Sequence, residues 1–505
     1  MNNPARSEPN AAANRWPPQI KYIVGNEACE RFSYYGMRSV LAGYITGAVL
    51  KGGLGQDADK ATEIIHLFVF VNYFMPLFGA WLSDKLIGRY HTILWVSLFY
   101  CAGHGVLACS DFVGGVDGKL ACLYTGLALI AFGSGGIKPC VSAFMGDQFK
   151  ADQGHLLQKA YGAFYWAINF GSFFSFLVIP WVKDSYGYSL AFGVPGILMA
   201  IATFVFWLGT KHYVRVPTSR ETKHAGYFKV FFHALLIRSS LVAADVRRLI
   251  LPTSEEKSEP RHLGCYGNSF WDAARDRFSE TEIDGAKSVP PILFVFALVP
   301  VFWSLFDQTN STWVMQGERM VPQTLLGLKI GAEQMQSMNP LMVMILVPLL
   351  TLGLYPRMGK FASPLRRMSY GMFLAVASYL VVAALQSRIE AGAQLNVLWQ
   401  TVPYLILTTA EVLISTTGLE FAFREAAPEL KSTIMSFWLL TVAFGNLLVT
   451  AITKIFSGAG SGDHAASVST GRFLMYAGLT FVVAILFSIV ATFYKYRDEA
   501  AARGE

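Results

Sequence analysis

Long apolar runs alternate with short polar connections along almost the whole chain. A helix needs about 20 apolar residues to cross a hydrocarbon core of roughly 30 Å, and about twelve runs approach that length. The runs lie near residues 32–50, 64–83, 92–110, 119–143, 161–182, 190–210, 289–312, 335–355, 368–386, 398–423, 433–456 and 473–494. The pattern therefore predicts an all-α integral membrane protein with about twelve transmembrane helices.

The composition agrees with this prediction. Of the 505 residues, 53% are hydrophobic, 14% are aromatic and only 15% are charged, and the mean hydropathy is +0.40. These values are typical of a polytopic membrane protein and exclude an ordinary soluble domain. Residues 1–21 are polar and contain four prolines, without the apolar core of a signal peptide. We therefore expect the first helix to be retained.

Basic residues are concentrated in every second connection. The second, fourth, sixth, eighth and tenth connections are rich in lysine and arginine, whereas the first, third and fifth hold only Lys51, Lys60, Lys119 and Lys183. Because basic loops remain in the cytoplasm, we expect both termini to be cytoplasmic. The net charge of +7 then reflects topology, and we expect no nucleic-acid partner.

The chain divides into two similar halves. Six runs precede residue 211 and six follow residue 288, with a charged stretch of about 75 residues between them. Part of that stretch, residues 227–244, is apolar enough to lie on the inner membrane surface, or else forms a loop. A substrate site between two halves is typical of transporters. The predicted parts are a cytoplasmic tail (1–21), a six-helix bundle (22–211), a cytoplasmic linker (212–288), a second six-helix bundle (289–494) and a cytoplasmic tail (495–505).

The first predicted helix carries charges where they are costly. One helical face holds, at i, i+4, i+7, i+8 and i+11, the residues Glu27, Arg31, Tyr34, Tyr35 and Arg38. Glu30 lies beside this face, and Glu27 precedes Arg31 by four residues, which favours an ion pair. Because ionisable residues inside a membrane usually mark a pathway or binding site, this face is the leading candidate for function.

Further motifs point to one family. The second connection, Gly79 to Tyr90, resembles the Gly-x-x-x-Asp-x-x-Gly-Arg loop of the major facilitator superfamily, with each spacer one residue longer. The other motifs are FGSGGIKPCVSAFMGDQF at 132–149, FYWAINFGS at 164–172, FDQ at 306–308, and the segment from Glu411 to Phe421. Together with the first helix, they resemble the proton-coupled oligopeptide transporter family, a branch of that superfamily. The resemblance implies the major facilitator fold, with two six-helix bundles.

The resemblance also implies a function and a set of site residues. It implies a symporter that imports di- and tripeptides across the cytoplasmic membrane by alternating access, with protons as coupling ion and no other cofactor. It places proton coupling on Glu27, Glu30, Arg31, Lys138 and His66. It places peptide binding on Arg31, Arg38, Tyr34, Tyr35, Tyr73, Lys138, Asn169, Asn339, Glu411 and Trp438.

Helix placement adds three expected contacts. Lys138 and Glu27 fall in the cytoplasmic halves of their helices, and a buried lysine needs a carboxylate neighbour, so we expect them to meet. Arg38 and Asp307 fall toward the outer ends of theirs, which predicts a gate between the halves. We also expect Glu420 to pair with Arg424 at i+4.

Some alternatives remain open. His66 resembles a helix-two histidine of animal peptide transporters and suits a proton role, or it is a neutral, hydrogen-bonded histidine. The protein is alternatively a carrier of nitrate or another small anion, or a peptide sensor without net transport. We find no metal cluster and no nucleophile with a base, so we expect no enzyme activity and no metal site. We expect a monomer surrounded by the lipid bilayer.

Overall fold

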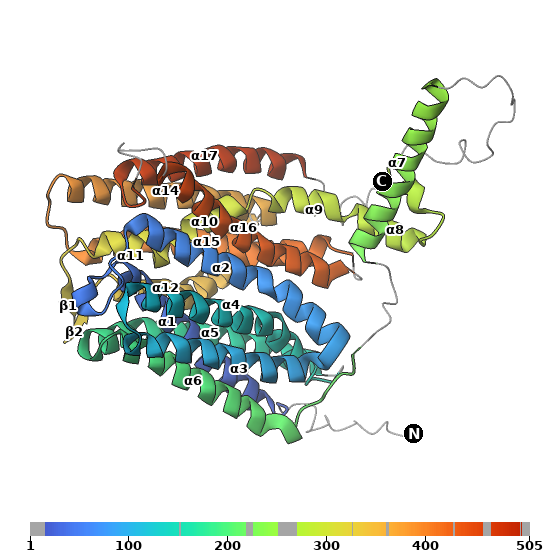
Figure 1. Cartoon of the computed structure of the whole chain (residues 1–505). Helices are drawn as coiled ribbons and strands as arrows, with labels where there is room; N and C mark the ends of the chain where they lie inside the picture. The colour runs from blue at the N-terminus through green and yellow to red at the C-terminus, as the bar shows by residue number, and fades with distance from the viewer. Residues whose placement is uncertain are drawn as a thin grey trace, which may run out of the picture.

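The computed structural model describes residues 16–150, 153–218, 226–250, 270–325, 327–359, 363–427, 430–457, 466–494 and 496. Most of the predicted tails, 1–21 and 495–505, lies outside these residues, as does 251–269 in the middle of the predicted linker. Almost all of the described chain is helical, as predicted (Figure 1).

Among the residues that the structure describes, twelve helical segments form the bundle. In chain order they are α1 (Ile20–Thr46), α2 (Ala58–Trp81), α3 (Gly88–Ala108), α4 (Gly115–Gly146), α5 (Gly154–Tyr186), α6 (Tyr188–Leu208), an interrupted helix containing α9 (Val289–Phe296) and α10 (Pro300–Phe306), α12 (Met338–Pro348), α14 (Pro364–Glu390), α15 (Thr401–Glu425), α16 (Lys431–Ser457) and α17 (Thr470–Phe493).

Length and apolarity alone identify fewer spans. Nine described helices are long and apolar enough to cross a membrane, or ten when the interrupted helix counts as one span. One of the nine, Ala58–Phe112, has 55 residues and divides into α2 and α3 at the π-helical turn η2 (Leu82–Ile87), where Gly88 has a φ of +80°. Helix α1 is not among the nine, because its five charged residues make it less apolar than the others. The prediction of about twelve helices agrees with the twelve segments.

Two helices differ in extent from the apolar runs of the sequence. Helix α1 begins at Ile20, well before its run near 32–50, and so contains the charged residues assigned to the first helix, which are buried among other helices and do not end it. The run predicted at 289–312 is broken, with a bend of 41° between the segments Glu280–Phe296 and Pro300–Asn310. Pro300 has no amide hydrogen to continue the helix. The chain goes on through the 3₁₀ turn η7 (Asp307–Asn310) and α11 (Thr312–Gly317).

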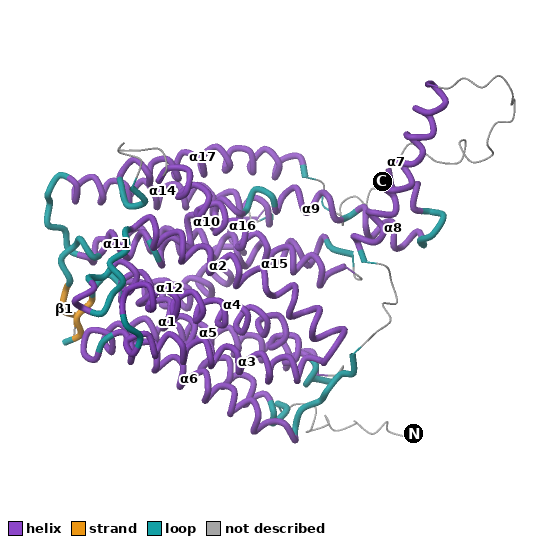
Figure 2. Tube along the Cα trace, viewed as in Figure 1, coloured by secondary structure: helices purple, strands orange, loops and turns teal. Residues whose placement is uncertain are grey.

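Shorter elements connect the long helices. The strands β1 (Gln323–Leu325) and β2 (Leu328–Ile330) form an antiparallel hairpin with Thr324 opposite Lys329 (Figure 2). The remaining elements are η1 (Val49–Lys51), η3 (Cys109–Phe112), η5 (Gly209–Lys211), α7 (Tyr227–Ile250), η6 (Phe270–Ala274), α8 (Glu280–Lys287), η8 (Gln334–Ser337), η9 (Leu349–Leu354), α13 (Tyr355–Met358) and η11 (Val397–Gln400). Residues 227–244, expected either to lie on the inner membrane surface or to form a loop, belong to helix α7.

The helices pack as two groups. In the first, α1 packs on α5 and α6, and α3 packs on α4 and α6; in the second, α14 packs on α15 and α17, and α10 packs on α16. The groups meet mainly where α2 packs on α16 and where α5 packs on α12 and η8. The β1–β2 hairpin lies at one end of the bundle, the hairpin end, and α7 and α8 lie at the other, the linker end (Figure 1).

Candidate functional site

Three charged residues of α1 form a buried cluster. The Arg31 guanidinium lies 3.1 Å from Glu27 Oε1 and also pairs with Glu30. Each of the three residues is no more than 5% exposed. The Ser134 hydroxyl on α4 donates to Glu30 at 3.4 Å. Two carboxylates therefore share one guanidinium in an environment from which water is excluded.

Lys138 does not form the expected ion pair with Glu27. Among the residues that the structure describes, no carboxylate lies within 4 Å of its ammonium, because Arg31 on the same helix as Glu27 occupies that carboxylate. The Lys138 nitrogen lies 3.7 Å from the centre of the Tyr73 ring and 5.8 Å from that of Tyr34. Cation–π contacts of this kind stabilise an ammonium without neutralising it, so its charge remains available to another anion.

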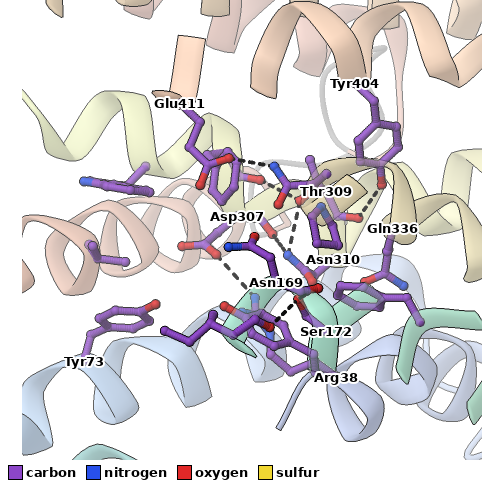
Figure 3. A pocket seen from close by; sticks show the side chains of 18 of the residues that line it. Arg38, Tyr73, Asn169, Ser172, Asp307, Thr309, Asn310, Gln336, Tyr404 and Glu411 are labelled. Atoms are coloured by element: carbon purple, nitrogen blue, oxygen red, sulfur yellow. Dashed lines mark hydrogen bonds and ion pairs between the residues drawn. The ribbon is translucent and has the colours of Figure 1, made fainter. Parts of the chain in front are cut away.

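A cavity of about 180 Å³ lies between the two groups of helices (Figure 3). Figure 3 shows Arg38 and Tyr73 on one side and Asp307 and Glu411 on the other. Seven of the predicted site residues line the cavity, namely Tyr35, Arg38, Tyr73, Asn169, Asp307, Asn339 and Glu411.

Other predicted site residues lie elsewhere. Glu27, Glu30, Arg31, Lys138, His66 and Tyr34 are absent from the cavity lining, although Lys138 lies against Tyr73, which is part of it. The Tyr34 hydroxyl accepts a hydrogen bond from Asn72 at 3.0 Å. Trp438, predicted as a pocket wall, instead packs its ring against Phe296, with centroids 5.3 Å apart, and over Gly418.

Glu411 is held in the cavity by an amide. The Asn339 side-chain nitrogen donates to Glu411 Oε2 at 2.6 Å and to Thr408 at 3.2 Å. On the opposite wall, the Asn169 nitrogen donates to the Tyr165 carbonyl at 3.0 Å, which orients its amide oxygen away from that backbone. A carboxylate and two amides thus face one space between the two halves.

A chain of polar contacts crosses between the halves near the cavity. The Arg38 guanidinium lies 3.3 Å from Asp307 Oδ1, and the Asn446 amide nitrogen donates to Asp307 Oδ2 at 2.7 Å. His66 Nδ1 is 2.7 Å from Asn446 Oδ1, and His66 Nε2 is 2.8 Å from the Ser311 hydroxyl. Because Asn446 presents its oxygen, His66 Nδ1 is the donor. The Arg38 and Asp307 contact is therefore present, and their role as a gate stays a prediction.

Further ion pairs join the halves at the hairpin end. Lys183 on α5 lies 2.5 Å from Glu333, which directly precedes η8. Lys454 on α16 lies 3.0 Å from Glu63 on α2. Burial raises the pKa of the Glu333 carboxyl to about 7. These two ion pairs hold the halves together at the hairpin end of the bundle.

Ion pairs also connect elements at the periphery of the bundle. Glu420 does not pair with Arg424; it binds Arg367 on α14 at 2.6 Å, because its side of α15 faces that neighbouring helix. In the connection between α2 and α3, Arg89 donates to both carboxylate oxygens of Asp147 at 2.7 Å and lies 3.6 Å from Asp84. This loop is thereby fixed to the end of α4.

Sequence reasoning missed several residues at the site. Asn446, which joins His66 to Asp307, interrupts an otherwise apolar run, and that interruption is the signal that could have identified it. The unpredicted polar lining residues are Tyr165, Ser172, Thr309, Asn310, Gln336 and Tyr404. Among the described residues, no group of three His, Cys, Asp or Glu side chains is placed to hold a metal ion.

The sequence is similar to those of known proteins. The PTR2 sequence profile, described as the POT family, matches residues 90–465. The chain is 34% identical over 429 residues to human solute carrier family 15 member 2, covering 82% of this chain and 55% of the relative. It is 36% identical over 389 residues to peptide transporter family 1 of Drosophila melanogaster, covering 75% and 49%. The chain thus spans about half the length of these curated relatives.

Solved structures resemble the whole fold. An auto-inhibited POT family peptide transporter superposes with a TM-score of 0.81 at 37% identity, covering 95% of this chain and 98% of the other. The POT family transporter PepTSo superposes with a TM-score of 0.79 at 38% identity, with the same coverage of both chains. The fold is therefore the predicted major facilitator fold, and the chain belongs to the POT family.

Proposed function

We propose that this protein is a proton-coupled symporter that imports di- and tripeptides into the cytoplasm by alternating access. One observation carries the proposal: the cavity drawn in Figure 3 lies between the two halves and is lined by charged and amide side chains from both of them. A short peptide carries an ammonium, a carboxylate and amide groups, so it needs this combination within one site.

Each end of the peptide has a chemical partner. Glu411, oriented by Asn339, binds the ammonium group. Lys138, which lacks a carboxylate neighbour among the described residues, binds the carboxylate from the Tyr73 side of the cavity. Asn169 and Asn339 then hold the peptide backbone, while Tyr35 and Tyr73 form walls of the site. Partners of this kind recognise features that all dipeptides share, so uptake is broad.

Proton coupling involves the buried cluster on α1. Because Glu27 and Glu30 share Arg31, one carboxylate can take a proton while the other keeps its partner. His66 also keeps both hydrogen bonds when protonated, since the Ser311 hydroxyl can accept as well as donate. Protonation of the α1 cluster or of His66 changes the charge that faces Arg38, Asp307 or Lys138. It thereby shifts the equilibrium between the two access states.

We assign the conformation of the structure to the access state in which the outer side is closed. The positive-inside pattern supports placing the linker end, where α1 begins and α17 ends, in the cytoplasm and the hairpin end outside an inner membrane. The Arg38–Asp307 and Lys183–Glu333 pairs then close the outer side. Opening that side requires both pairs to separate. The protein acts as a monomer, without a metal or other cofactor.

Uptake of labelled dialanine into proteoliposomes tests this function. With an inward proton gradient, wild type accumulates dialanine, and an uncoupler abolishes accumulation. Glu27→Gln retains exchange but loses accumulation, and Glu411→Gln loses binding. Glu420→Gln, nine residues farther along α15 and bound to Arg367, is the matched control and retains both activities. Absence of uptake and exchange by folded wild type would refute the proposal and favour an anion carrier first and a peptide sensor next.

A further inference from the structure

A second cavity, of about 300 Å³, lies at the linker end of the first group of helices, away from the site between the halves (Figure 1). Its lining comes from the connection between α2 and α3, from the first residues of α3, and from residues 215–218 after η5. Its ionisable side chains are those of Arg89, His91 and Arg215, and no described residue of its lining carries a carboxylate. The cavity is therefore basic.

The two arginines differ in what balances their charge. Arg89 donates to both carboxylate oxygens of Asp147 at 2.7 Å and lies 3.6 Å from Asp84, so its charge is neutralised. Arg215 has no carboxylate within 4 Å among the residues that the structure describes. Its Cζ lies 3.9 Å from the centre of the Tyr90 ring, and its one hydrogen bond there is to a backbone carbonyl at 3.4 Å. Since a guanidinium has five N–H donors, most of those of Arg215 remain for an anion.

Tyr90 holds the Arg215 guanidinium in place. The Tyr90 ring is buried against Phe206, with centroids 5.6 Å apart, and its hydroxyl forms a hydrogen bond of 2.7 Å with that of Thr210. A guanidinium that lies over a fixed ring keeps its position while its edge stays free. That edge presents two parallel N–H groups, the arrangement that binds phosphate in a bidentate manner.

The rim of this cavity is apolar. Leu86, Ile87 and Val216 belong to the lining and are between 40% and 54% exposed. One turn along α3 from His91, Trp95 is 55% exposed. An exposed indole near the end of a membrane-spanning helix is typical of the lipid headgroup region. A phospholipid matches both features, because its phosphate is joined to apolar chains, whereas a free phosphate leaves the apolar rim uncovered.

We propose that this cavity binds the phosphate group of an anionic phospholipid in the leaflet at the linker end. Arg215 is its main ligand, with His91 beside it, and the acyl chains follow α3 past Trp95. A headgroup without an ammonium binds better, because no positive charge of its own balances the phosphate. Since Arg215 lies in the connection from α6 to α7, the bound lipid holds the start of the linker against α3. The inference does not depend on which substrate the protein carries.

The test measures the melting temperature of the protein in detergent during titration with lipid. Dioleoyl phosphatidylglycerol raises it in a saturable manner, and dioleoyl phosphatidylcholine, which has the same chains, raises it less. In Arg215→Gln the apparent affinity for phosphatidylglycerol falls about ten-fold, as expected for the loss of charge-assisted hydrogen bonds. Lys211→Gln is the matched control and keeps the wild-type affinity, because Lys211 is an exposed cation four residues away and outside the cavity.

Each remaining outcome decides for or against the lipid. Equal affinity of wild type and Arg215→Gln for phosphatidylglycerol overturns the inference, as does an equal loss in Lys211→Gln, because the lipid then responds to surface charge alone. Soluble glycerol phosphate separates the two sources of phosphate: if it stabilises wild type as strongly as phosphatidylglycerol at equal concentration, the assignment to a lipid is wrong. Arg215→Lys keeps the charge without the paired N–H groups, so its affinity falls several-fold. Because Arg215 is exposed, these substitutions leave the fold intact.

Discussion

At the residue scale, the pair formed by Arg38 and Asp307 is the contact whose energy is most directly testable. Both side chains are buried, 3.3 Å apart. Removing one partner of a buried pair leaves an uncompensated charge, which typically costs about 3–5 kcal/mol. Arg38→Gln or Asp307→Asn should each lower the free energy of unfolding by about this amount, measured by denaturation in detergent. The double variant should lose clearly less than the sum, because it leaves no charge unpaired.

Asn446 supplies the control for this cycle. It also donates to Asp307, but it is uncharged. The loss of unfolding free energy in the double variant Asn446→Leu with Arg38→Gln should therefore equal or exceed the sum of the losses in the two single variants. Additivity of Arg38→Gln with Asp307→Asn would contradict a direct interaction. The sequence could predict that Arg38 and Asp307 meet, because both carry charge at similar depth. It could not predict that Asn446 joins Asp307 to His66 or that Lys138 lies on Tyr73, since those contacts depend on how α16 and α2 are rotated about their axes.

At the element scale, Gly418 lets α15 and α16 approach closely. A Cβ at this position would overlap the Trp438 ring, which is buried between the helices. Gly418→Ala should therefore force the indole or the helix to move and destabilise the protein by about 1–3 kcal/mol. Thermal unfolding in detergent measures the effect. Gly478→Ala on α17 is the control, because a Cβ there meets nothing within 4 Å; equal melting temperatures for the two variants would refute the packing argument.

Most helices were predictable as elements because lipid-facing helices must be apolar along their length. The rule fails where a helix is shielded by its neighbours. Helix α1 begins earlier than its apolar run, since Glu27, Glu30 and Arg31 are paired inside the bundle. The break at Pro300 was likewise invisible to a hydropathy window, because apolar residues continue on both sides of it. That break places Asp307 in a short 3₁₀ turn at the cavity.

At the scale of the whole molecule, the sequence predicted two halves with a site between them but not which access state they adopt. The count of runs on either side of a charged linker is a property of the sequence. The balance between states depends on a few contacts across the interface, each contributing only a few kcal/mol. The Lys183–Glu333 pair is one of these contacts, and nothing in the residue pattern around either position identifies the other.

The Glu333 carboxyl should make closure of the hairpin end depend on pH. It faces Lys183 and Asp184 on α5, Tyr188 on α6, and Glu318, whose own pKa is also raised by burial. Burial raises the pKa of Glu333 from 4.5 to about 7 in the closed state, whereas an open, solvated carboxyl has its ordinary value. Between these values the closed state binds a proton that the open state releases. By linkage, acid therefore favours closure, and raising the pH through 7 favours opening.

Spin labels on the two halves can measure this dependence. Leu50 and Leu325 are exposed near the hairpin end, and cysteines introduced there report the distance across the interface by electron paramagnetic resonance. The open fraction of wild type should rise between pH 5 and pH 8, and Glu333→Gln, which cannot ionise, should remove that rise. Glu63→Gln, which affects the other pair at this end, should keep it. A wild-type distance distribution that is the same at both pH values would show that Glu333 does not control closure, since its proton would then be bound equally in both states.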